Sequence, residues 1–341
     1  MIREAIRKVV EGEDLGEPEA VAAMTEIMDG EATPAQIASL ITALRIKGET
    51  VDEITGFVRV MRDKCVKVRP TRTPLIDTCG TGGDRLNTFN ISTTAAFVVA
   101  GAGVAVAKHG NRAASSKCGS ADVLEALGVK FALPADLVGR CIDECGIGFM
   151  FAPALHPAMK HAIGPRKEIG IRTVFNILGP MTNPAGARYQ VIGVFAPHLC
   201  ELMAKVLSKL GTERAMVVHG TDGLDEVSTL GETCVAEADG KAVTTRRLMP
   251  SDLGCPVASA EDLAAGEGPE DNARALVSVL SGESGPKRDI VLANAGAALF
   301  VAGRARDLRE AMAVAAESVD SGAALRALEN LRRFAEAHQS S

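Results

Sequence analysis

Residues 75–84 read LIDTCGTGGD, and this stretch decides the fold. Its short apolar run predicts a buried strand, which leads directly into Gly80, Gly82 and Gly83. Because glycine has no side chain, the backbone N–H groups of such a loop can close around an anion. The loop is therefore a candidate phosphate cradle, although it matches neither a dinucleotide fingerprint nor a Walker loop. Taken alone, the stretch leaves an ordinary glycine turn open as the alternative.

The chain beyond this stretch predicts an α/β protein. Short β-prone runs alternate with helical stretches and lie at residues 75–76, 104–106, 148–151, 191–195 and 216–218. This alternation predicts a mainly parallel central sheet with flanking crossover helices. Residues 233–249, with Asp239-Gly240 between two Val/Thr-rich runs, predict an antiparallel hairpin at a sheet edge. The last forty residues predict helices with a break at Ser321-Gly322.

The first 64 residues predict helices only. The capping-box pairs Thr33 with Gln36 and Thr50 with Glu53 each mark a helix start. The character of the chain changes near Arg69-Pro70, where the β-prone runs begin. We therefore expect a small all-helical N-terminal domain over residues 1–70 and a larger α/β domain over residues 71–341.

Charge and composition exclude several classes of protein. The 341 residues carry 37 Lys and Arg against 43 Asp and Glu, a formal net charge of −6, whereas proteins that hold nucleic acid by its phosphates are basic. The longest apolar stretch, residues 95–107, is too short for a membrane span, and the N-terminus lacks a signal-peptide core. The eight cysteines include no C-x-x-C pair, so we expect buried thiols rather than a zinc site. These features predict a cytoplasmic protein without a nucleic-acid or membrane partner.

Anion-binding groups gather in three loops. The run Asn90-Ile91-Ser92-Thr93 precedes an Ala-rich helix, whose N-terminal dipole favours negative charge, and an ordinary N-cap is compatible with that role. The run KHGNR at residues 108–112 leaves the predicted strand of residues 104–106, and Ser115, Ser116 and Ser120 follow it. Ligands of open α/β sheets lie beyond the carboxyl ends of the strands. We therefore expect the three loops to converge on one anionic ligand.

A pair of adjacent acids, Asp225 and Glu226, follows the predicted strand over residues 214–218. Neighbouring carboxylates repel one another unless a cation shares them, and magnesium prefers oxygen ligands beside substrate phosphates. The pair is a candidate magnesium site, with two solvated acids as the alternative. Asp222, which is followed by a glycine, is typical of a turn.

Four segments of the chain resemble the anthranilate phosphoribosyltransferase family. They are GTGGD at 80–84, NIST at 90–93, KHGNRAASSKCGSADVLEALG at 108–128 and HPAMKHAIGPRKEIGIRTVFNILGPMTNP at 156–184. The resemblance implies a reaction of anthranilate with phosphoribosyl pyrophosphate that gives N-(5-phosphoribosyl)anthranilate and pyrophosphate, with Mg²⁺, in tryptophan biosynthesis. It also implies a helical domain completed by part of residues 165–188, a phosphoribosyl pyrophosphate-binding α/β domain, and a homodimer.

The same resemblance implies roles for individual residues. Lys108 and Arg166 are the implied catalytic residues, and Gly80, Asn111 and Arg166 match anthranilate contacts. A planar guanidinium also suits a carboxylate physically, because the two form parallel hydrogen bonds; a surface arginine is the alternative for Arg166. Ser92 resembles a magnesium ligand and joins Asp225 and Glu226 in the expected metal site. The implied contacts to phosphoribosyl pyrophosphate are Gly80, Gly83, Asp84, Thr88, Asn90, Ser92, Thr93, Lys108, Ser116 and Ser120.

Two other functions compete with this interpretation. A pyrimidine nucleoside phosphorylase has the same architecture and a Lys-His-Gly loop, but the long segment at residues 156–184 argues against it. A non-catalytic relative that binds nucleic acid would be basic, whereas this chain is acidic.

His156 and His161 lack a third ligand for zinc. His109 is not expected to be essential, because a neutral aromatic amine needs no deprotonation before it attacks.

Overall fold

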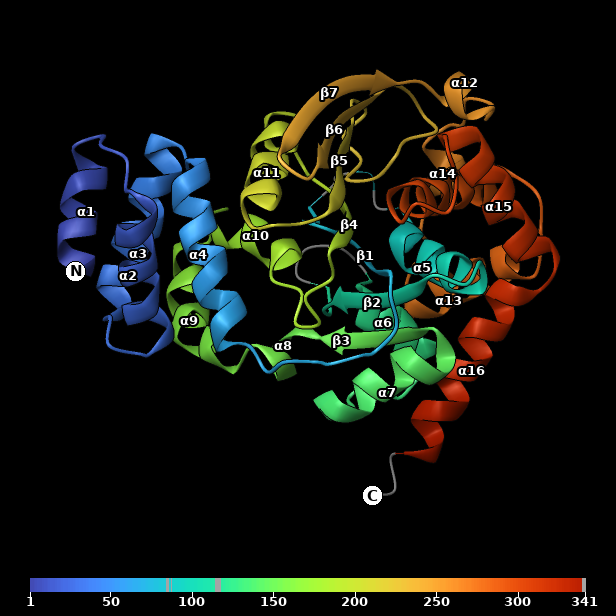
Figure 1. The fold of residues 1–341 in the computed structure, drawn as a ribbon, viewed down its shortest axis with the longest axis horizontal. Helices are drawn as coiled ribbons and strands as arrows, with labels where there is room; N and C mark the ends of the chain where they lie inside the picture. The colour runs from blue at the N-terminus through green and yellow to red at the C-terminus, as the bar shows by residue number, and fades with distance from the viewer. Residues whose placement is uncertain (84–85, 87, 114–117, 339–341) are drawn as a thin grey trace.

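The computed structural model describes residues 1–83, 86, 88–113 and 118–338. A bundle of four helices stands beside a larger α/β part in which helices flank a sheet (Figure 1). The expected combination of a small helical unit and a larger α/β unit is confirmed. Among the described residues, no helix has the length and apolar character needed to span a bilayer.

One seven-stranded sheet, with strand order β3-β2-β1-β4-β5-β6-β7, forms the centre of the larger part. The pairs among β1 to β5 are parallel, and β6 and β7 add the predicted antiparallel hairpin at one edge. Two predicted β-prone runs extend past the observed strands, since Val104 precedes β2 and Phe195 lies beyond β4, whereas β1, β3 and β5 are longer than their predicted runs. The strands are β1 (Leu75–Gly80), β2 (Ala105–Gly110), β3 (Ile147–Phe151), β4 (Tyr189–Gly193), β5 (Arg214–Gly220), β6 (Thr233–Asp239) and β7 (Ala242–Leu248).

The N-terminal bundle consists of α1 (Ile2–Val10), α2 (Glu17–Met28), α3 (Pro34–Lys47) and α4 (Val51–Lys64). Both predicted capping boxes are present. The backbone N–H groups of Gln36 and Glu53 donate to the hydroxyls of Thr33 and Thr50, respectively, each over 3.3 Å. These bonds satisfy backbone donors that the first turn of a helix leaves unpaired. The local sequence therefore fixes where α3 and α4 begin.

Helices cover both faces of the sheet. Helix α5 packs with α14 and α16, while α11 packs on β5 and β6 (Figure 1). The longer helices of this part are α5 (Ile91–Gly101), α6 (Ser120–Ala126), α7 (Ala135–Cys145), α9 (Lys160–Ile169), α11 (His198–Lys209), α13 (Pro269–Leu280), α14 (Pro286–Val301), α15 (Leu308–Asp320) and α16 (Ala323–Ala337). The short ones are α8 (Ala152–Leu155), α10 (Phe175–Leu178), α12 (Pro250–Leu253) and the 3₁₀ turns η1 (Pro157–Met159), η2 (Gly179–Met181) and η3 (Glu261–Leu263).

Alternate residues of the central strands enter two different cores. Val191 of β4 packs into the core beneath α5 and α14, whereas the next residue, Ile192, packs into the core shared with the helical bundle. This alternation is the two-residue period of a strand that is buried on both faces. The second core includes Val174 and Phe175, which lie in the segment expected to complete the helical domain. The domain limits at residue 70 and within residues 165–188 stay predictions.

Candidate active site

The glycine loop begins where β1 ends, in the middle of the sheet. Gly82 and Gly83 have φ angles of +65° and +86°, which side chains rarely allow, so glycine is required for this turn. A Cβ atom on Gly80 would collide with the Asp225 carboxylate, and one on Gly193 would collide with the Asp225 carbonyl oxygen. The glycines therefore allow the acidic loop after β5 to approach the end of β1 closely.

The two adjacent acids hold two different loops. The Gly82 N–H donates to Asp225 Oδ2 over 2.8 Å, and the Ser92 N–H donates to Glu226 Oε1 over 3.1 Å. Burial raises the pKa of Asp225, while the Gly82 N–H and the charge of Arg172 oppose that shift. The pair thus links the glycine loop to the N-terminus of α5.

Lys108 lies beneath the same N-terminus. Its side chain is 3% exposed, and its Nζ donates to the Thr78 carbonyl over 2.5 Å and to Ser92 Oγ over 3.5 Å. Burial lowers the pKa of the ammonium, whereas the charges of Asp77 and Glu226 raise it. The structure therefore places Lys108 and Ser92, which come from two of the three predicted loops, next to each other and to Glu226.

Asn90 connects the start of α5 to two further loops. Its side-chain amide donates to the Cys118 carbonyl over 3.2 Å, and its backbone N–H donates to Asn272 Oδ1 over 3.2 Å. Asn90 Oδ1 is buried and has no hydrogen-bond partner within the described ranges. Buried polar atoms are nearly always paired, so this oxygen marks a place for a ligand donor or a water molecule.

The other residues predicted to contact phosphoribosyl pyrophosphate lie in three places. Thr93 is buried in α5, and Thr88 forms an isolated bridge with Ala264. Ser120 Oγ donates to the Asn111 carbonyl over 3.2 Å, so these two residues lie together at the end of β2. Asp84 and Ser116 lie outside the described residues, as do Arg85 and Ser115.

A buried network behind Lys108 was not predicted from the sequence. Asp77 Oδ1 accepts the His109 N–H over 3.1 Å, and Asp77 Oδ2 accepts Asn183 Nδ2 over 2.7 Å. Burial raises the pKa of Asp77 to about 6 even though Lys108 lowers it. The available signal was an acid inside an apolar strand, because a fully buried aspartate needs partners.

Arg166 lies on α9 as a half-buried cation. Its guanidinium carbon is 5.1 Å from the centre of the Phe175 ring, and burial lowers its pKa. Among the residues that the structure describes, no carboxylate pairs with it and no hydrogen bond joins it to exposed Asn111. A half-buried guanidinium in this state has donors available for a carboxylate ligand.

His109 and His156 form a pair of buried rings. Their ring centres are 5.1 Å apart, and neither Nε2 has a partner in the described part of the chain. Burial lowers the pKa of His109 to about 3 and that of His156 to about 4. Both rings are therefore neutral at pH 7.

The side chains near the glycine loop offer few ligands for a metal ion. No group of three or more His, Cys, Asp or Glu side chains with metal-binding geometry occurs among the described residues. Ser92, Asp225 and Glu226 nevertheless provide oxygen atoms next to the glycine loop. Mg²⁺ commonly takes one or two carboxylates and completes its shell with water and substrate phosphates, so these residues fit it.

Comparison with known proteins supports a two-part enzyme. Residues 3–65 match the family described as "Glycosyl transferase family, helical bundle domain", and residues 72–325 match "Glycosyl transferase family, a/b domain". The anthranilate phosphoribosyltransferase of Symbiobacterium thermophilum is 59% identical over 329 residues, which is 96% of each chain. That of Moorella thermoacetica is 57% identical over 98% of this chain and 99% of its own.

Solved structures agree with these relatives. Anthranilate phosphoribosyltransferase from Thermus thermophilus has a TM-score of 0.92 at 47% identity and covers 97% of this chain and 99% of its own. The Saccharomyces cerevisiae enzyme in complex with PRPP and Mg has a TM-score of 0.88 at 29% identity, with 98% of each chain covered. The same yeast enzyme has also been solved with 4-fluoroanthranilate.

The fold and the loops around Ser92 define a glycosyltransferase built from a helical bundle and an α/β domain. Several anthranilate phosphoribosyltransferases are more than 50% identical in sequence to this chain over nearly its whole length, which identifies the family within this class. The chain belongs to the anthranilate phosphoribosyltransferase family.

Proposed function

We propose that this protein transfers the 5-phosphoribosyl group of phosphoribosyl pyrophosphate to the amine of anthranilate, in tryptophan biosynthesis. The products are N-(5-phosphoribosyl)anthranilate and pyrophosphate. The observation that carries the proposal is the cluster in which Lys108, Glu226 and the N-terminus of α5 meet at Ser92. Family membership and the yeast complexes with PRPP and with 4-fluoroanthranilate support the two substrates.

The donor side of the site suits a diphosphate. The N-terminus of α5, whose helix dipole favours negative charge, and the Lys108 ammonium offer positive charge to the departing pyrophosphate. Lys108 is buried and held by Thr78, so it needs little reorganisation during the reaction. The residues proposed to bind phosphoribosyl pyrophosphate are Gly80, Gly83, Asp84, Thr88, Asn90, Ser92, Thr93, Lys108, Ser116 and Ser120.

Mg²⁺ is the proposed cofactor, held by Ser92, Asp225 and Glu226. Their oxygen atoms lie around the loops that would receive the diphosphate, and a yeast relative has been solved with PRPP and Mg. A bound Mg²⁺ would neutralise part of the negative charge on the diphosphate. The carboxylates themselves keep the glycine loop and α5 in place through Gly82 and Ser92.

The acceptor side is proposed to comprise Gly80, Asn111 and Arg166. Arg166 would bind the anthranilate carboxylate with two parallel hydrogen bonds, which fixes the orientation of the neighbouring amine. His109 and His156, which are neutral at pH 7, would add no charge that competes for the carboxylate. This arrangement assigns the acceptor to α9 and to the end of β2.

The proposed reaction is a displacement at the anomeric carbon of the ribose. A bond forms from the anthranilate nitrogen to this carbon as the bond to the diphosphate oxygen breaks, with inversion of configuration. Positive charge develops on the sugar and negative charge on the leaving group, and Lys108 and the N-terminus of α5 would stabilise the negative charge. The amine is neutral at pH 7, so it loses its proton only after attack and no strong general base is required.

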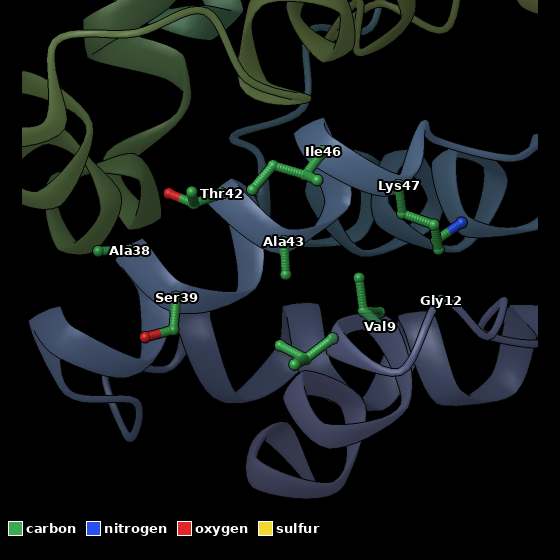
Figure 2. A pocket seen from close by; sticks show the side chains of 9 residues that line it. Val9, Gly12, Ala38, Ser39, Thr42, Ala43, Ile46 and Lys47 are labelled. Carbon is green, nitrogen blue, oxygen red and sulfur yellow. The ribbon is translucent and has the colours of Figure 1, made fainter.

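The helical bundle is proposed to form a homodimer interface. Residues of α1 and α3 line an open hollow of about 530 Å³, which lies in the bundle rather than at the glycine loop (Figure 2). Val10 and Ile46 line this hollow and are 69% and 82% exposed. Burial of such apolar side chains against a second copy would stabilise a dimer.

The proposed location is the cytoplasm. All eight cysteines are free thiols, which agrees with a reducing compartment.

A fluorescence assay tests the proposed reaction. Anthranilate is fluorescent, and its signal should fall when phosphoribosyl pyrophosphate and Mg²⁺ are both present. Omission of either component should stop the decrease. A constant signal in the complete mixture, together with release of pyrimidine base from a nucleoside and phosphate, would instead identify a nucleoside phosphorylase.

A further inference from the structure

Arg172 holds the glycine loop, although it is not among the proposed substrate contacts. It follows α9 and the left-handed turn at Gly170, which has a φ angle of +64°. Its Nη2 donates to the Gly83 carbonyl over 2.7 Å. The guanidinium carbon lies 4.4 Å from the centre of the Phe195 ring. Arg172 thus connects the segment that follows the Arg166 helix to the loop that follows β1.

The ring beneath Arg172 is itself tied to the glycine loop. The Phe195 N–H donates to Thr81 Oγ1 over 3.1 Å, and the Thr81 N–H donates to the Gly193 carbonyl over 2.9 Å. Stacking of a planar guanidinium on this ring restricts its orientation. The donor that reaches Gly83 is therefore held in place on a support that contacts the same loop.

An acidic and a basic side chain hold Gly82 and Gly83, two successive residues of the glycine loop. Asp225 accepts the Gly82 N–H over 2.8 Å, while Arg172 donates to the carbonyl of Gly83. A Cβ on Gly83 would collide with Nη2 of Arg172 and would displace the guanidinium, and the φ angle of +86° at Gly83 also favours glycine. No carboxylate forms an ion pair with Arg172 within the part of the chain that the structure describes.

We propose that Arg172 is a positioning residue that fixes the glycine loop in the conformation that receives the diphosphate of phosphoribosyl pyrophosphate. The inference rests on the proposed function. Glycines lose more conformational freedom on ordering than other residues, so a free glycine loop would lose entropy each time it closed on a ligand. A loop that is ordered before binding avoids much of that loss. Arg172 therefore affects the affinity for the phosphoribosyl donor rather than that for anthranilate.

The test combines donor affinity with loop mobility in the full-length protein. Arg172→Ala is compared with wild type and with the control variant Arg188→Ala. Arg188 lies immediately before β4 and forms an ion pair with Glu213. We expect Arg172→Ala to raise the KM for phosphoribosyl pyrophosphate about tenfold to hundredfold, the usual effect of losing a charged hydrogen bond. The KM for anthranilate and the melting temperature should stay near the wild-type values. Arg172→Lys should recover part of the loss, since lysine can donate to Gly83 but cannot stack as a plane.

Hydrogen exchange distinguishes positioning from a direct phosphate contact. In the substrate-free protein, the peptide that contains Gly82 should exchange faster in Arg172→Ala than in wild type or Arg188→Ala. Unchanged exchange with weakened donor binding would make Arg172 a direct contact and overturn the positioning role. An unchanged KM for the donor in an active Arg172→Ala variant would also overturn it. Inactivity of the wild-type protein would instead refute the proposed function.

Discussion

Replacement of Arg166 by alanine should impair the use of anthranilate and leave the fold almost intact. The structure gives the guanidinium a stacking contact with Phe175 at 5.1 Å and no ion pair among the described residues. Loss of the cation–π contact costs about 0.5–1 kcal/mol of stability at a partly exposed site. Loss of a charged hydrogen bond to the substrate costs about 1.5–3 kcal/mol, which lowers kcat/KM for anthranilate roughly tenfold to hundredfold.

Steady-state kinetics with each substrate varied in turn measures this effect. Arg140→Ala is a matched control, because the Arg140 guanidinium lies 5.9 Å from the Phe334 ring and pairs with Glu144 on α7. Aniline lacks the carboxylate, so Arg166→Ala and wild type should use it about equally poorly. Unchanged anthranilate kinetics with a large rise in the KM for phosphoribosyl pyrophosphate would refute the assignment of Arg166 to the acceptor.

Three further predictions concern the metal, the dimer and pH. Asp225→Asn with Glu226→Gln should shift a magnesium titration of activity to higher concentration while thermal melting shows a folded protein; coincident titrations would indicate solvated acids. Ile46→Asp, at an exposed position of α3, should convert a dimer to monomers in light scattering, and a monomeric wild type at micromolar concentration would disprove the interface. Burial lowers the pKa of His156 to about 4 from 6.5, so the unfolded state binds more protons, and about 3 kcal/mol of stability should be lost as the pH falls from 6.5 to 4. His156→Gln should show a flatter dependence of unfolding free energy on pH, and identical curves would contradict this account.

Features encoded by neighbouring residues could be predicted from the sequence. The capping pairs at Thr33 and Thr50 act over three residues, so they define helix starts before any tertiary contact forms. The Asp239-Gly240 turn lies between two β-prone runs and gives the hairpin of β6 and β7. The ends of β2 and β4 were less accurate, because pairing with neighbouring strands rather than local apolar character sets where a ladder stops.

Contacts between distant residues could not be predicted in the same way. Gly82 and Asp225 are 143 positions apart, and Gly83 and Arg172 are 89 apart. Glycine and acidic motifs indicate that a site exists, but only the packed sheet shows which backbone group each side chain holds. Asp77 and Asn183 were missed for the same reason, since their hydrogen bond depends on burial that neither local sequence specifies.

The phosphoribosyl group is proposed to be transferred at the cluster around Lys108 and Ser92. The most direct measurement follows anthranilate fluorescence and pyrophosphate release in the same reaction, for wild type and for Lys108→Met. We expect wild type to consume anthranilate and release pyrophosphate in equal amounts, dependent on Mg²⁺, and the folded variant to lose most of both rates. Pyrophosphate release without anthranilate consumption, or a fully active Lys108→Met variant, would contradict this proposal.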